Sequence, residues 1–162
     1  IHMESDIAIR LRRPPETGPL TARRLGVLAF AVYGSRRLTS ASRGSTGLRC
    51  VGLSSNRPPP QKEWFDSFAE SRGGVIVARL GEVYLRLAAV KEGFGVSLLP
   101  CVLGDSDSDL VRLTPPVREL AEDMYLLVHN DMRKLGPVHE ITSNLVHFFK
   151  ANHCAFSGAD RA

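Results

Sequence analysis

The most constraining feature of the sequence is an alternation of apolar, strand-like runs with helix-like segments. The apolar runs lie at 48–53, 75–80 and 96–99, and segments of helical periodicity lie between them at 61–71 and 82–92. Short strand–helix–strand connections of this kind form parallel βαβ crossovers. Apolar runs that lack polar alternation indicate strands covered on both faces. The pattern therefore predicts an α/β fold.

The rest of the chain predicts further strands and one long closing helix. The helix begins at Pro137, since proline is favoured in a first turn, and a buried stripe is expected along it at Val138, Ile141, Leu145 and Phe148. Glu82 and Arg86 have the spacing of an ion pair on one helix face. The additional strands are expected at 6–11, 24–34 with a bend near Gly26, 110–113 and 123–129, with a loop at 16–23 and a fraying tail after His153.

Composition excludes several classes of protein. The 162 residues carry 21 Lys+Arg against 17 Asp+Glu and are 43% hydrophobic, which is ordinary for a globular protein and not for a disordered one. No apolar run reaches the roughly 18 residues of a membrane helix, and prolines and arginines stand where a secretion signal would be apolar. Because the arginines are scattered, they predict a solvated surface and not a nucleic-acid-binding face. We expect a cytoplasmic protein that does not enter a membrane.

Neither a metal site nor a cofactor motif is predicted. The three cysteines, Cys50, Cys101 and Cys154, are odd in number and lack CxxC spacing, so they are expected to be reduced thiols. The five histidines do not have metal-ligand spacing. Residues 105–109 resemble the start of a calcium loop, but Leu110 occupies the position of its sharp-turn glycine. We therefore expect a solvated acidic loop, no bound metal and no cofactor.

An ordered set of short motifs resembles the effector-binding domain of LysR-type transcriptional regulators. The resemblance covers about residues 5–150. Its most specific part is 87–100, where an alanine-rich helix is followed by Gly-x-Gly, an apolar strand and proline. The other parts are Asp6–Arg10, Arg23–Gly26 with Tyr33–Ser35, Leu110–Leu113, Leu126–His129 and the helix at 137–150.

The resemblance implies a two-lobed fold like that of type 2 periplasmic binding proteins. On that basis residues 30–125 form a complete second lobe, while 4–29 and 126–150 form a partial first lobe. Residues 1–3 read as a cloning scar and start, and 151–162 as a flexible tail. The chain then corresponds to an N-terminally truncated regulator, whose DNA contacts belong to a missing helix-turn-helix. Its implied partners are a small-molecule effector, carboxylates among the candidates, and further copies of itself.

Candidate ligand-binding residues lie where strands end, because ligands of α/β sheets bind beyond the carboxyl ends of strands. Each also has an ordinary structural explanation, such as a salt bridge for Arg10, turn chemistry for the serines or core packing for Cys101. The resemblance places Arg10 opposite the start of the 82–92 helix, where Glu82 would repel an anion. The candidates are Arg10, Ser35, Ser54, Ser55, Gly81, Glu82, Pro100 and Cys101.

Two other functions stay open at this point. The first is a solute-binding protein of the related two-lobed class, without a role on DNA. The second is an enzyme that uses Cys101 as a nucleophile, but the sequence identifies no base for it. We therefore expect a ligand-sensing domain that is not an enzyme.

Overall fold

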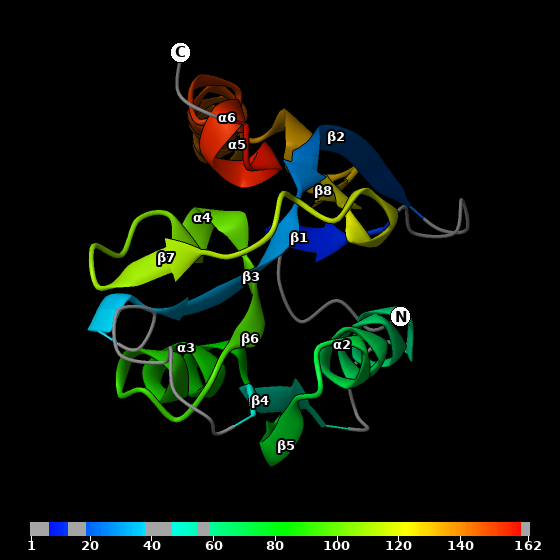
Figure 1. Ribbon diagram of the computed structural model, residues 1–162. Helices are drawn as coiled ribbons and strands as arrows, with labels where there is room; N and C mark the ends of the chain where they lie inside the picture. The colour runs from blue at the N-terminus through cyan, green and yellow to red at the C-terminus, as the bar shows by residue number, and fades with distance from the viewer. Residues whose placement is uncertain (1–6, 13–18, 38–46, 55–58, 160–162) are drawn as a thin grey trace. The chain divides into compact units, whose positions relative to one another are not determined.

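The computed structural model describes residues 7–12, 19–37, 47–54 and 59–159 (Figure 1). The chain divides into two compact units. Unit 1 comprises residues 1–28 and 121–162, and unit 2 comprises residues 29–120.

Unit 2 is built around β-strands with helices between them. Its strands are β3 (Phe30–Ser35), β4 (Arg49–Leu53), β5 (Val75–Leu80), β6 (Ser97–Pro100) and β7 (Leu110–Arg112). Its helices are α2 (Pro59–Ser71), α3 (Val83–Lys91), α4 (Cys101–Gly104) and the 3-10 helix η1 (Arg118–Leu120).

The sheet of unit 2 is mixed, whereas only parallel crossovers were expected from the sequence. Strand β4 runs parallel to β5, and a parallel bridge between Cys50 and Val96 joins β4 to β6. Strand β3 then pairs antiparallel with both β6 and β7. The βαβ prediction is confirmed for β4, β5 and β6, which are parallel and joined by helices. No crossover helix leads into β3, and this strand runs antiparallel to its neighbours.

The core of unit 2 lies between β3, β6 and helix α3. Tyr33, Val90 and Leu99 are fully buried there, together with Cys101. Full burial of a large apolar side chain stabilises a fold by about 1.5–3 kcal/mol. The sequence predicted strands covered on both faces, and this is wrong for β5. Val75 on that strand is 60% exposed, and β5 pairs only with β4 among the described strands, so it lies at the edge of the sheet.

The acidic segment 105–109 is the largely exposed loop expected from the sequence, and ion pairs also tie it to the rest of unit 2. Asp105 accepts a hydrogen bond from the Tyr33 hydroxyl at 2.7 Å and pairs with Arg112. Asp107 lies 2.7 Å from the Lys91 ammonium. Leu110 is buried and begins β7, so the segment connects α4 to a core strand.

Unit 1 is an antiparallel sheet with helices packed against it. Its strands are β1 (Ile7–Leu11), β2 (Leu20–Leu28) and β8 (Glu122–His129), in the order β1-β8-β2. Its helices are η2 (Met132–Lys134), α5 (Gly136–Ala151) and α6 (His153–Ser157).

The limits predicted for β2 from the sequence are wrong. This strand begins at Leu20, inside the expected loop, and the single strand expected at 24–34 is two strands, β2 and β3, in different units. The bend near Gly26 is confirmed, because the pairing with β8 shifts between Arg24 and Gly26. Gly26 has φ 155°, which glycine adopts at little cost.

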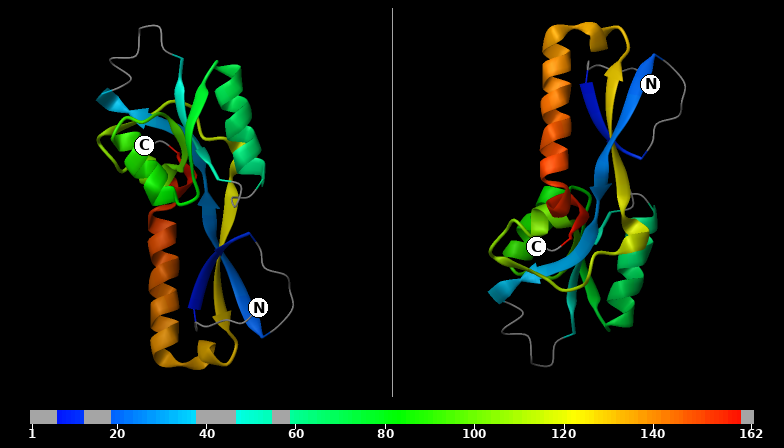
Figure 2. Two further views of the ribbon diagram at one scale, coloured as in Figure 1. Left: turned by 90° about the horizontal axis from the view of Figure 1, so that it is seen from below. Right: turned by 90° about the horizontal axis from the view of Figure 1, so that it is seen from above.

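Helix α5 covers one face of this sheet, alongside β8 (Figure 2). Val138 packs there with Leu126 and Val128. The expected buried stripe is nevertheless wrong in part, because Ile141 and Phe148 are each about half exposed. They lie on a flank of the helix and not on the face turned to the sheet.

The expected fraying tail is also wrong for the residues directly after His153. They form α6, and the Phe156 ring lies 4.8 Å from the ring of Phe149, centroid to centroid. Gly158 ends α6 with a left-handed φ of 68°. The apolar Phe156 therefore holds this last helix against α5.

Candidate functional site

Four of the predicted residues lie at one edge of the unit 2 sheet. Ser54, Gly81 and Pro100 stand at the carboxyl ends of β4, β5 and β6, which run in the same direction. A Cβ added to Gly81 would lie 3.0 Å from the Ser54 hydroxyl oxygen. The half-buried Ser54 hydroxyl therefore packs against Gly81, and it can come this close because glycine has no side chain. We call Ser54, Gly81, Glu82 and Pro100 the strand-end site.

Helix α3 begins at this edge and directs its N-terminus there. Glu82 is the N-cap in extended conformation, and its exposed side chain makes no capping hydrogen bond. The helical bonding begins with the Arg86 amide, which donates to the Glu82 carbonyl oxygen at 3.2 Å. The amides of the first turn carry the positive end of the helix dipole, which favours an anion.

The buried Arg86 is the site residue that sequence reasoning missed. Its side chain is directed inward, and one guanidinium nitrogen donates to the carbonyl oxygens of Leu80 and Gly81 at 3.0 and 2.8 Å. It thus holds the turn between β5 and α3 and places a positive charge beneath the strand-end site. Arg86 lies three residues after Val83 and four before Val90, on the buried helix face, but the same position also fits a surface ion pair with Glu82, so the sequence held no signal that distinguishes the two.

The other predicted residues do not join this group. Arg10 is exposed on β1, which belongs to unit 1. Ser55 lies outside the described residues. Ser35 lies at the opposite edge of the sheet from Pro100, because β3 is antiparallel to β6 and Pro100 pairs with Phe30 instead. The assumption that all strand ends meet at one edge is wrong for β3.

Cys101 is placed for packing. It is fully buried at the start of α4, within the core cluster that contains Tyr33 and Leu99. Burial raises the pKa of its thiol, although a hydrogen bond with Tyr33 acts in the other direction. A buried thiol with a raised pKa stays protonated at neutral pH, so it is a poor nucleophile.

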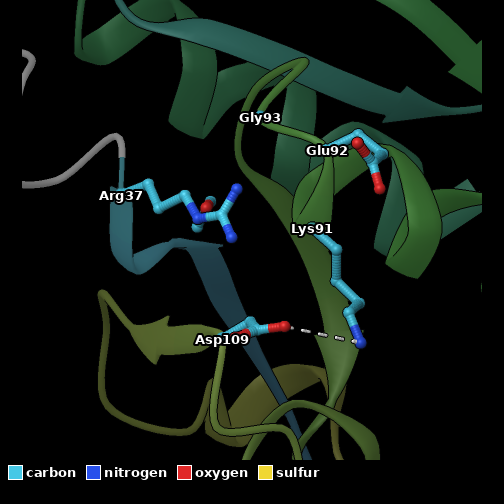
Figure 3. A pocket seen from close by; sticks show the side chains of 6 residues that line it. Arg37, Lys91, Glu92, Gly93 and Asp109 are labelled. Atoms are coloured by element: carbon cyan, nitrogen blue, oxygen red, sulfur yellow. Dashed lines mark ion pairs between the residues drawn. The ribbon is translucent and has the colours of Figure 1, made fainter.

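A hollow lined in part by Ser35 lies at the C-terminal end of α3, away from the strand-end site. Figure 3 shows Lys91, Glu92 and Gly93 at this end of the helix. The hollow has a volume of about 290 Å³, and charges of both signs line it. Lys91 is held by Asp107 at 2.7 Å and lies 3.9 Å from Asp109. The positive charge of Lys91 is therefore balanced by acidic neighbours. The lining residues are Ser35, Arg37, Lys91, Glu92, Gly93 and Asp109.

Two features are absent from the described part of the chain, a metal-binding cluster and a membrane-spanning helix. No group of three or more His, Cys, Asp or Glu side chains is arranged there to hold a metal ion. No described helix has the length and apolar character needed to cross a membrane.

Comparison with solved structures gives the fold a close parallel, whereas no protein-family model and no curated sequence matches the chain. The CrgA regulatory domain of Neisseria meningitidis, a LysR-type regulator, superposes with a TM-score of 0.69 at 17% identity, over 89% of this chain and 75% of that one. The C-terminal domains of a LysR family protein from Agrobacterium tumefaciens give 0.63 at 20% identity, over 90% and 72%. The Synechocystis CcmR regulatory domain, solved with 2-PG, gives 0.60 at 16% identity, over 91% and 74%.

These likenesses establish the class of fold. The chain has the α/β fold of the regulatory domains of LysR-type transcriptional regulators, which is of the periplasmic-binding-protein type. The α/β fold of LysR regulatory domains that the sequence motifs implied is confirmed.

Proposed function

We propose that this chain is the effector-sensing domain of a LysR-type transcriptional regulator, without catalytic activity of its own. The fold supports the proposal, because solved regulatory domains of this type share it. One of these domains was solved with the small molecule 2-PG. In the proposed role, binding of an effector alters how a larger, oligomeric regulator acts on its DNA.

The observation that carries the ligand assignment is the positive character of the strand-end site. The first-turn amides of α3 and the buried Arg86 guanidinium both favour an anion, and the Ser54 hydroxyl can donate a hydrogen bond. We infer a small carboxylate as the ligand. The exposed carboxylate of Glu82 competes with such a ligand for the same amides, which weakens binding.

Removing the charge of Glu82 tests this assignment. We expect Glu82→Gln to strengthen binding of small carboxylates by up to about 1 kcal/mol, the size of a charge effect at a helix N-terminus. Titration calorimetry or ligand-observed NMR against a panel of small carboxylates measures the change. Glu92→Gln is the matched control, since it makes the same change at the other end of α3. If only Glu92→Gln binds carboxylates more tightly, the ligand site is the hollow around Ser35 and not the strand-end site.

A second variant tests the contact that the LysR resemblance implies for Arg10. If its guanidinium bonds a carboxylate ligand, Arg10→Ala should weaken binding by ~1.5–3 kcal/mol. Arg23→Ala is the control, because Arg23 is an exposed arginine on β2 in the same sheet. If carboxylate binding is the same in Arg10→Ala and Glu82→Gln as in the unaltered chain, our placement of the site is wrong.

A further inference from the structure

The hollow around Ser35 has walls from three elements of unit 2 (Figure 3). The end of β3 and the segment after it provide Ser35 and Arg37, the C-terminal end of α3 provides a second wall, and Asp109 comes directly before β7. The volume of the hollow, about 290 Å³, is near the lower end of the ~300–1,000 Å³ that small-molecule sites have. A ligand that fits here is therefore a small one.

The wall that carries Asp109 is held in place by hydrogen bonds. The Arg36 amide donates to the Asp109 carbonyl oxygen at 2.8 Å, and the Asp109 amide donates to the Asp107 carboxylate at 3.0 Å. The Arg36 guanidinium also donates to the carbonyl oxygens of Ser108 and Leu110, at 3.1 and 3.2 Å. These bonds join the end of β3 to the start of β7, so the backbone of this wall is fixed before a ligand arrives.

The wall at the end of α3 has negative character. The Lys91 ammonium is neutralised by the Asp107 carboxylate at 2.7 Å, whereas the Glu92 carboxylate is exposed. Gly93 has a left-handed φ of 81°, and its amide donates to the Val90 carbonyl oxygen at 3.0 Å, which closes the helix. The carbonyl groups of a last helical turn carry the negative end of the helix dipole. This wall therefore favours a cation.

A positive group borders the hollow on another side. Figure 3 shows the Arg37 side chain extending from the segment after β3 toward the end of α3. A guanidinium has five N–H donors in a planar fork that matches a carboxylate. The Asp109 side chain, also in the lining, is 65% exposed, so its carboxylate is accessible to a ligand. The hollow thus offers partners for both charges of a small molecule.

We propose that the hollow binds a small zwitterion of the α-amino acid type, at a site separate from the strand-end site. The carboxylate of the ligand bonds the Arg37 guanidinium, and its ammonium lies against Glu92, Asp109 and the negative end of α3. The charges select this class, because a plain carboxylate would face the two acidic side chains and a plain amine would face Arg37. This binding does not depend on the ligand of the strand-end site.

Two-dimensional amide NMR of the isotope-labelled chain measures this binding and locates it. L-Alanine is the probe, and propionate and ethylamine are its matched controls, because each of them lacks one of the two charges. We expect L-alanine to shift the amide signals of Gly93 and Asp109 saturably, with a dissociation constant on the order of millimolar. The dissociation constants of the two controls should be at least about threefold higher.

Two variants test the assigned contacts. Arg37→Gln and Glu92→Gln should each raise the dissociation constant for L-alanine about three- to fivefold, the size of an exposed ion pair. Both side chains are exposed, so the fold should persist, and the amide spectrum of each variant reports whether it does. Glu82→Gln makes the same change at the other end of α3 and should leave this constant unaltered.

The proposal is overturned if L-alanine leaves the Gly93 and Asp109 amides unmoved at about 50 mM, or if propionate shifts them as strongly. An L-alanine titration that moves only the amides of Gly81 and Val83 overturns it too, since the amino acid then binds at the strand-end site in keeping with the proposed function. Failure of small carboxylates to bind at the strand-end site contradicts the proposed function alone, because the hollow should still bind L-alanine.

Discussion

At the scale of single residues, Tyr33 makes the stability of unit 2 depend on pH. Burial raises the pKa of Tyr33, and its hydrogen bond to Asp105 at 2.7 Å raises it further. The unfolded tyrosine ionises near pH ~10 whereas the folded one stays neutral, so stability is lost as pH rises above that value. We expect Tyr33→Phe to show a shallower fall in the free energy of unfolding between about pH 9 and 11.

Urea unfolding across that range measures the slope. Tyr84→Phe is the control, because Tyr84 is 68% exposed and the same hydroxyl is removed. Some slope should persist in Tyr33→Phe, since burial also raises the pKa of the Cys50 and Cys101 thiols. Identical slopes in Tyr33→Phe and the unaltered chain would contradict the prediction.

Position 104 has to be a glycine, because the Tyr33 ring fills the space that a side chain there would occupy. A Cβ on Gly104 would lie 2.4 Å from two ring carbons of Tyr33, which is fully buried and has no room to move. Gly104→Ala should therefore lower the free energy of unfolding by ~1–3 kcal/mol, as overpacking does. Gly136→Ala meets nothing within 4 Å and should have no such cost in the same urea titration.

At the scale of elements, α6 should contribute measurably to the stability of unit 1. The Phe156 ring lies 4.8 Å from that of Phe149 and 6.3 Å from that of Phe148. Because Phe156 is only partly buried, Phe156→Ala should cost about 2 kcal/mol, less than a core Phe→Ala change. Urea unfolding measures this, with Phe94→Ala, an exposed ring in unit 2, as the control. A cost no larger than that of the control would mean that α6 is not held by this contact.

The sequence predicts those elements whose pattern is local. Apolar runs, and glycines that end a helix, predict the bounds of β4, α2, β5 and α3 to within about two residues, a margin typical of helix and strand ends. It fails where tertiary contacts decide, because the antiparallel course of β3 and the division of the 24–34 run into β2 and β3 leave no local signal. For the same reason the inward course of Arg86 was missed, since a helix-surface ion pair and a buried arginine have identical spacing.

At the scale of the whole molecule, both units neutralise part of their basic composition by ion pairs. In the described part of the chain these pairs include Arg12 with Glu122, Arg24 with Asp123, Lys62 and Arg79 with Asp66, Lys91 with Asp107, and Arg112 with Asp105. The formal net charge of +4 is thus spread over a surface of interleaved signs. Such a surface lacks the concentrated positive charge on one face that binds the phosphate backbone of a nucleic acid.

We therefore predict that this chain alone forms no sequence-specific complex with DNA. At low ionic strength its exposed arginines should give weak, sequence-independent retardation, and counterion release makes that binding fall steeply as salt rises. Gel shifts at about 50 and 150 mM salt, with two unrelated duplexes of equal length, measure this. A discrete complex at the higher salt that forms with one duplex and not the other would contradict the prediction. It would also mean that the ion pairs leave a basic face open, and that the chain does more than sense an effector.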